Sequence, residues 1–119
     1  MTVRELLAAS APEDADFQRL VNVFVDEFRR ADHVRRQAII MEGPQQPGRR
    51  EGLAAAVVSA LCREADMAPP PWVCEIYSPE PFFAFPARGF ALRLRLMLES
   101  PPPFRTRNVF VPENYLARA

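Results

Sequence analysis

The chain has 119 residues, a formal net charge of zero and a hydrophobic content of 49%. This length fits one domain with a real core, and the hydrophobic content excludes a chain that is disordered throughout. The balance of 15 basic and 15 acidic residues argues against bulk electrostatic attraction to nucleic acid. The chain contains no lysine, so every basic residue is an arginine.

The N-terminus lacks the apolar run of a signal peptide, and no segment approaches the length of a membrane span. We therefore expect a cytoplasmic bacterial protein that does not bind a membrane. Cys62 and Cys74 have no neighbouring histidine or cysteine, a spacing that matches no zinc motif. We expect two buried, reduced thiols, with a disulfide as the alternative, and neither a metal nor a cofactor.

The first 42 residues carry helical signals. Thr2 and Glu5 have the spacing of a capping box, which predicts a short helix over residues 3–9. From about 12 to 41, apolar residues recur at steps of three and four and predict one long amphipathic helix, with a break near Asp32 and His33 as the alternative. The apolar stripe of this helix consists of Phe17, Leu20, Val21, Phe24, Phe28, Ala31 and Ala38.

A loop and a third helix follow. Glycine and proline at both ends of residues 43–48 predict the loop. A stripe of small apolar residues between Leu53 and Leu61 predicts a helix over about 49–66. Because small side chains let two helices approach closely, we expect this helix to pack against the Phe-rich stripe of the N-terminal helix.

Three prolines at 69–71 end that helix and open a short one that reaches Tyr77. Trp72 follows these prolines directly, and we expect it to be a hydrophobic plug, with an interface anchor as the alternative. The segment 78–86 predicts an irregular loop that is held down by the rings of Phe82, Phe83 and Phe85.

Residues 88–98 fit two structures. Leucines alternate with arginines, which is the periodicity of a strand, yet the composition is that of a helix and lacks β-branched residues. We favour the helix. In a helix, four apolar residues would face inward, namely Phe90, Leu94, Met97 and Leu98.

The three prolines at 101–103 cannot continue a helix, so they predict the start of an extended C-terminal segment. Side chains two residues apart in an extended segment project from the same side, which would display Arg105 and Arg107 together. The alternative is that this segment packs on its own domain. Residues 109–111 fit a short strand or plain extended chain.

The whole chain is predicted to be mainly α, one compact helical domain over 1–119. It has N-terminal helices over 1–42 and a helical and aromatic region over 49–119.

No catalytic constellation is visible. His33 is the only histidine, and as a neighbour of Asp32 on a helix it does not face that carboxylate, so we expect a solvated side chain. Six arginines late in the long helix and early in the next one could form a patch for nucleic acid or an acidic partner, while interleaved acidic residues favour a self-neutralised face. These arginines are Arg29, Arg30, Arg35, Arg36, Arg49 and Arg50.

The second half of the chain resembles small bacterial proteins that carry Pro-x-Trp, an aromatic segment, S-P-x-x-F-R-x-R-N-V-F-V and a closing L-x-R. The resemblance covers about residues 50–119. It implies an antitoxin-like role beside a toxin gene, although this chain has no helix-turn-helix at its N-terminus. The matching positions are Trp72, Ser100, Pro101, Phe104, Arg105, Arg107, Asn108, Val109, Phe110, Val111, Leu116 and Arg118.

The leading hypothesis is a non-enzymatic, antitoxin-like module that binds a partner protein, such as a toxin encoded nearby, through its C-terminal segment. The alternative is a nucleic-acid-binding transcriptional regulator that uses the arginine patch. The oligomeric state stays open, a homodimer included. The residues expected at the partner contact are Trp72, Phe104, Arg105, Arg107, Asn108 and Phe110.

Overall fold

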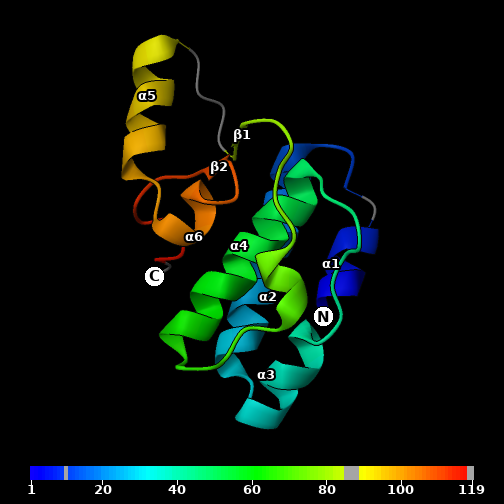
Figure 1. Cartoon of the computed structure of the whole chain (residues 1–119). Helices are drawn as coiled ribbons and strands as arrows, with labels where there is room; N and C mark the ends of the chain where they lie inside the picture. Colours follow the sequence, from blue (N-terminus) through cyan, green and yellow to red (C-terminus); the bar gives the residue numbers. More distant parts are fainter. Residues whose placement is uncertain (10, 85–88, 118–119) are drawn as a thin grey trace.

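The computed structural model describes residues 1–9, 11–84 and 89–117 (Figure 1). Within these ranges the chain is mainly α-helical, as predicted, with one 3₁₀ turn and one short parallel sheet. None of the helices found there is long and apolar enough to cross a membrane. In chain order the elements are α1 (Val3–Ala8), α2 (Asp14–Arg30), α3 (His33–Ile40), α4 (Arg49–Glu64), η1 (Pro71–Cys74), β1 (Phe82–Phe83), α5 (Phe90–Glu99), α6 (Pro102–Arg105) and β2 (Val109–Phe110).

Side-chain caps set the start of two N-terminal helices. The Thr2 hydroxyl accepts a 3.1 Å hydrogen bond from the backbone N–H of Glu5, which confirms the predicted cap of α1. The Asp32 carboxylate accepts a 2.8 Å bond from the backbone N–H of Arg35 and starts α3. The long helix predicted over 12–41 is therefore two helices, and the break lies at the alternative position, after the extended backbone of Ala31.

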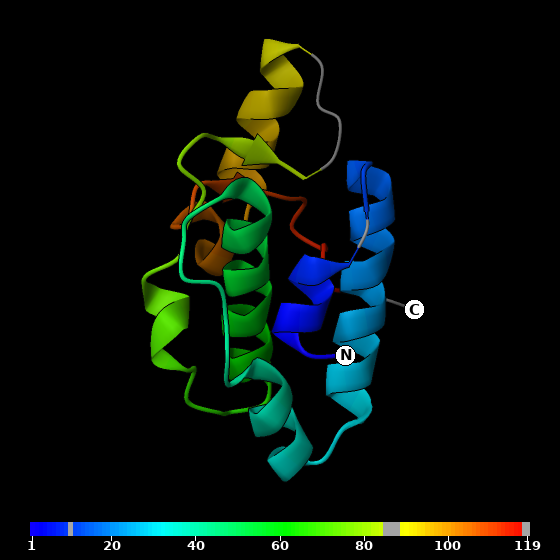
Figure 2. The ribbon, with the colours of Figure 1, turned by 90° about the vertical axis from the view of Figure 1, so that its right-hand side faces the viewer.

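Helix α4 is the centre of the core. Its residues 52–58 are all buried, and α1, α2, η1, α6 and β2 contact it (Figure 2). Phe24 and Phe28 of α2 belong to the same buried cluster as Leu53 and Leu61 of α4, so the predicted packing of large against small side chains is confirmed. All-round burial explains why α4 has a weaker amphipathic pattern than α2.

Gly52 lets a loop approach α4 closely. A Cβ at this position would lie 2.6 Å from the backbone nitrogen of Ser78, closer than atoms normally approach. The same loop is fixed at the start of α4, where the backbone N–H of Gly48 donates a 3.2 Å hydrogen bond to the Tyr77 carbonyl. The glycine therefore places the segment after η1 directly against the central helix.

The C-terminal half combines the short sheet with α5 and α6. Strand β1 pairs in parallel with β2, with Phe82 opposite Val109, so part of the predicted aromatic loop is a strand, and the expected anchor Phe85 lies outside the described ranges. Residues 90–99 form a helix, which confirms the favoured interpretation over a strand. Helix α5 projects from one end of the molecule in both views (Figures 1 and 2).

The triproline segment differs from its prediction in one respect. It ends α5 at Glu99, as expected, but the chain then forms the helical turn α6 and becomes extended only at β2. The backbone N–H groups of the first helical turn have no partner within the helix, so the missing N–H of proline costs nothing there. Pro102 and Pro103 therefore suit the start of α6. The C-terminal segment, defined here as residues 100–117, is thus not extended throughout.

The cysteines also correct one expectation. Both thiols are free, and Cys62 is buried, where desolvation raises its pKa and favours the protonated thiol. Cys74 is exposed instead of buried. Cys74 is the last residue of η1. This turn directs Val73 into the core and leaves Cys74 on the solvent side.

Candidate interaction surface

Two aromatic rings expected to contact a partner are buried in the domain itself. Phe104 and Phe110 are only 1% and 5% exposed. The Phe104 ring packs edge-to-face on Tyr115 with centroids 5.3 Å apart, and Phe110 packs on Phe83 at 5.2 Å. These rings therefore hold the C-terminal segment onto the body of the molecule.

Arg107 is part of the internal hydrogen-bond network. Its Nε and Nη2 donate to the Val73 carbonyl at 3.1 and 3.0 Å, and its Nη1 donates to the Pro103 carbonyl at 2.7 Å. The side chain is half-buried, and this desolvation lowers the pKa of the guanidinium. The fork that was expected to grip a partner thus ties η1 to the end of α6.

Arg105 is exposed, so the two arginines do not project from the same side. The expectation assumed an extended backbone, but Arg105 is the last residue of α6 and Arg107 lies in the turn after it. Of this pair, Arg105 is the one that remains accessible to a partner.

Asn108 fixes the turn between α6 and β2. Its φ of 63° is left-handed, a conformation that asparagine tolerates better than most residues. Its Nδ2 donates a 3.1 Å bond to the Ser78 carbonyl, and its own carbonyl accepts a 3.0 Å bond from the N–H of Phe82. Asn108 therefore aligns the two strands of the sheet.

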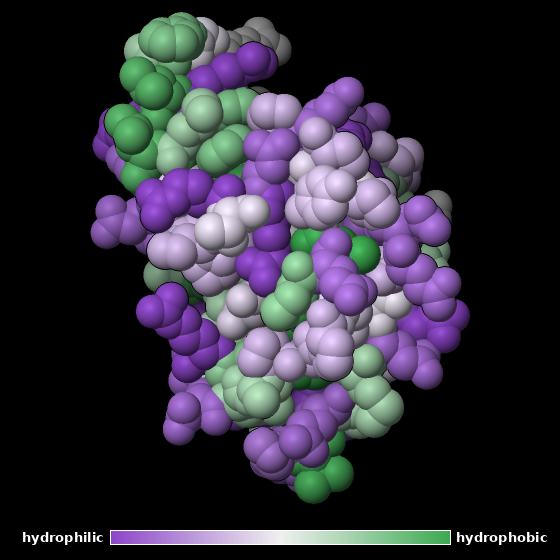
Figure 3. All heavy atoms as spheres, viewed as in Figure 1, coloured by the Kyte–Doolittle hydropathy of each residue, from purple (hydrophilic) through white to green (hydrophobic). Residues whose placement is uncertain are grey.

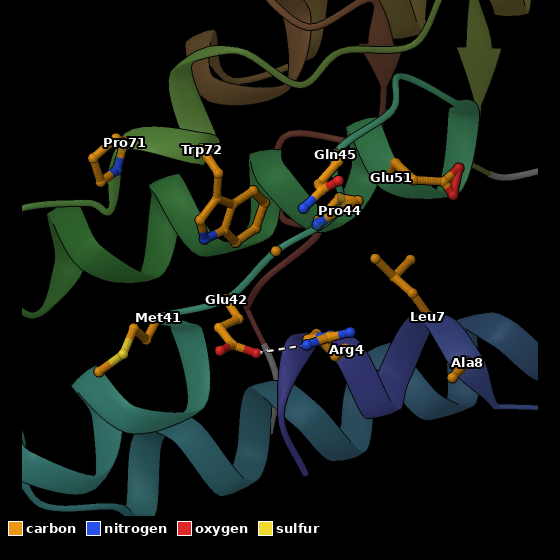
Figure 4. Close-up of a pocket in the computed structure, with 11 residues that line it drawn as sticks. Arg4, Leu7, Ala8, Met41, Glu42, Pro44, Gln45, Glu51, Pro71 and Trp72 are labelled. Atoms are coloured by element: carbon orange, nitrogen blue, oxygen red, sulfur yellow. Dashed lines mark hydrogen bonds and ion pairs between the residues drawn. The ribbon is translucent and has the colours of Figure 1, made fainter.

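Trp72 is half-buried beside a groove of about 870 Å³ (Figure 4). Its Nε1 donates a 2.8 Å hydrogen bond to the Ile40 carbonyl, and a Cβ at Gly43 would overlap the indole ring. An ion pair of 2.8 Å joins Arg4 and Glu42 across the groove. Trp72 thus acts mainly as the expected plug, with one edge open to the groove.

The arginines late in α2 and in α3 make intramolecular contacts. Arg29 forms a two-bond ion pair with Glu64 of α4, at 3.0 and 2.9 Å. Arg36 of α3 donates to the carbonyls of Phe28 and Arg29 at 2.9 and 2.8 Å, and so satisfies acceptors at the end of α2. These contacts support the self-neutralised interpretation of this face.

The other arginines of the predicted patch lie elsewhere. Arg49 and Arg50 both reach Oδ1 of Asp14 at 3.3 Å, at the start of α2. Asp14 and Arg29 lie about 22 Å apart along the helix, from a rise of about 1.5 Å per residue. The six arginines therefore form two separate groups, with Arg30 and Arg35 exposed in the first of them.

Several exposed apolar side chains follow α5. Phe90 and Leu98 are 81% and 71% exposed, and Leu94 and Met97 are 42% and 41% exposed. Steps of four, three and one place these four residues on one side of the helix, which we call the α5 face. The prediction that they point inward is wrong for the isolated chain. Figure 3 shows the hydrophobic side chains gathered over α5.

The opposite side of α5 anchors it. Leu96 is buried and packs with Phe110 and Phe83. On the flanks, the Arg93 guanidinium stacks on the Phe83 ring at 5.3 Å, and Arg95 pairs with Glu99 at 2.7 Å. Sequence periodicity could find the stripe but could not tell which of the two apolar sides of α5 meets the body.

A groove of about 480 Å³ runs beside the α5 face. Its walls come from α5 and from the segment that enters β1, and they carry both apolar groups and one charge of each sign. The lining residues are Glu80, Pro81, Phe83, Phe90, Arg93, Leu94 and Met97.

His33 is exposed, as expected for a solvated helix residue. Among the residues that the structure describes, no three side chains of His, Cys, Asp or Glu come together as metal ligands.

Comparisons with models of protein families, with curated proteins and with solved structures find no match to this chain. The kinship with antitoxin-like proteins stays a prediction that rests on the residues of the C-terminal half.

Proposed function

We propose that the chain is a non-enzymatic protein-interaction module and that the α5 face is its contact surface. One observation carries the proposal: four large apolar side chains point into solvent from one side of α5, while Leu96 on the other side is buried against Phe110 and Phe83. Their exposed area is roughly 500 Å², near the upper end of what a monomer normally leaves uncovered. An apolar patch of this size is often functional.

The C-terminal segment supports this surface from behind. Ser100 is buried, its hydroxyl lies 2.6 Å from the Leu96 carbonyl, and it accepts a 2.8 Å bond from the N–H of Val111. This links the last turn of α5 to the chain after β2. A helix held in this way loses little conformational entropy when a partner docks.

The antitoxin-like role belongs to the proposal as well. It makes the product of a neighbouring gene one candidate partner. In this account, residues that the sequence singled out serve recognition indirectly. Phe110 packs on Leu96 of α5, and Arg107 fixes the turn between α6 and β2 by its bonds to Val73 and Pro103. Arg105 remains the exposed residue of that group.

Site-specific photo-crosslinking in cells tests the contact surface without assuming the partner. A photoreactive phenylalanine analogue replaces Phe90 on the α5 face, and the same analogue at Val34 of α3, which is 76% exposed, is the matched control. We expect a discrete protein adduct from position 90 and none from position 34. The same probe at Arg105 examines the C-terminal segment directly.

The adducts decide between the two surfaces. An adduct from position 105 with none from position 90 would return the contact to the C-terminal segment and contradict the proposal. Equal adducts from positions 90 and 34 would show nonspecific capture and would also contradict it. The mass of an adduct specific to position 90 identifies the partner.

A further inference from the structure

We propose that the α5 face is covered by the α5 face of a second copy, so that the chain forms a two-fold symmetric homodimer through antiparallel helices. This inference rests on the proposed function and names the occupant of its contact surface. It is carried by the spacing of the exposed residues, by their area and by the charges around them.

The spacing is self-complementary. In an antiparallel pair centred on Leu94, each Phe90 meets Leu98 of the other copy, and the two Leu94 side chains meet at the axis. A two-fold interface needs such a patch, because the same surface must complement itself. The groove beside the α5 face offers room for the rings and methyl groups of the second copy.

The area fits a dimer. A standard interface covers about 800 Å² on each partner, and about 65% of a homodimer interface is apolar, which amounts to about 520 Å². The four residues of the α5 face expose roughly 500 Å², close to that apolar share. A larger partner surface is not needed to cover the exposed apolar atoms.

The charges permit the contact. Glu80 and Arg93 line the same groove with opposite signs, and Arg95 is neutralised by Glu99 on the other flank. A second copy therefore brings charges of both signs to the rim, and the formal net charge of zero gives no long-range repulsion between copies. Helix α5 projects from one end of the molecule in both views (Figures 1 and 2).

Charge-swap variants at the predicted axis test the dimer. Sedimentation velocity is compared for the wild type, Leu94→Glu, Leu94→Lys and an equimolar mixture of the two variants, with Val34→Glu as the exposed control. We expect a wild-type dimer at micromolar concentration and a dissociation constant raised roughly hundredfold in each single variant, because like charges then face each other. The mixture should restore the dimer, since opposite charges meet, and Val34→Glu should behave as the wild type.

Circular dichroism melts verify that each variant folds, and the mixture guards against a folding artefact because misfolded chains would not regain the dimer. A monomeric wild type, a dimer that persists in Leu94→Glu, or a mixture that stays monomeric would each overturn the inference. If position 90 then crosslinks to a different protein, the proposed function stands and the second copy is excluded. An adduct from position 90 with twice the mass of the chain would support both the proposed function and the homodimer.

Discussion

Phe24→Ala should lower the free energy of unfolding by about 3–5 kcal/mol. The Phe24 side chain of α2 is fully buried, in the cluster that contains Leu53 and Leu61 of α4. Removing the ring loses its transfer free energy and leaves a cavity, which helices joined by several other contacts cannot close completely. Urea titration monitored by circular dichroism measures the change.

Val23→Ala is the matched control, because Val23 neighbours Phe24 on α2 but is 43% exposed. Its effect should stay within about 0.5 kcal/mol. A loss below about 1 kcal/mol for Phe24→Ala would show that this side of α2 does not form the core.

Arg107→Ala should lower the free energy of unfolding by about 2–4 kcal/mol, whereas Arg105→Ala should change it by no more than about 0.5 kcal/mol. The Arg107 guanidinium makes three hydrogen bonds to the carbonyls of Val73 and Pro103, and its loss leaves these acceptors without their donor. Arg105 is exposed and serves as the control two positions away.

Arg107→Lys refines this test. Lysine keeps the charge but lacks the planar fork that bonds two carbonyls at once, so an intermediate loss is expected. Thermal melts of the three variants give the ranking. Equal melting temperatures for Arg107→Ala and Arg105→Ala would contradict the structural role of Arg107. Both arginines would then be surface residues that do not stabilise the fold.

Local signals in the sequence predicted the N-terminal half well. Caps act over three residues, so Thr2 could be identified as a helix start without any tertiary information, whereas the Asp32 cap divides what was predicted mainly as one helix. The Phe24 and Phe28 stripe was also predictable, because a strong period of 3.6 residues with large side chains fits one buried face. The small residues of α4 then indicated the partner of that face.

The C-terminal half depends on contacts that local patterns do not contain. The prolines at 101–103 are compatible with an extended chain and with a first helical turn, and tertiary packing of Phe104 selects the turn. That turn separates Arg105 from Arg107 and changes their roles. The bonds of Arg107 to Val73 and of Asn108 to Ser78 join residues 34 and 30 positions apart, which no spacing rule reaches.

The direction of α5 is the most instructive difference. Its apolar periodicity predicted that Phe90, Leu94, Met97 and Leu98 are covered, and in the isolated chain they are not. A periodic stripe states that a helix has an apolar side, but it does not state which molecule covers that side. The inward prediction and the observed exposure agree if the cover is another chain, which is the central claim of this account.

Hydroxyl-radical footprinting of the assembled protein tests that claim most directly. The oxidation rates of Phe90 and Met97 are compared between the wild type and Leu94→Glu, with Met41 on the rim of the other groove as the internal reference because it is 66% exposed. We predict that Phe90 and Met97 are oxidised slowly in the assembled wild type and rapidly in the variant, while Met41 reacts alike in both. Equal rates for Phe90 and Met97 in the two proteins would contradict the claim that another chain covers the α5 face.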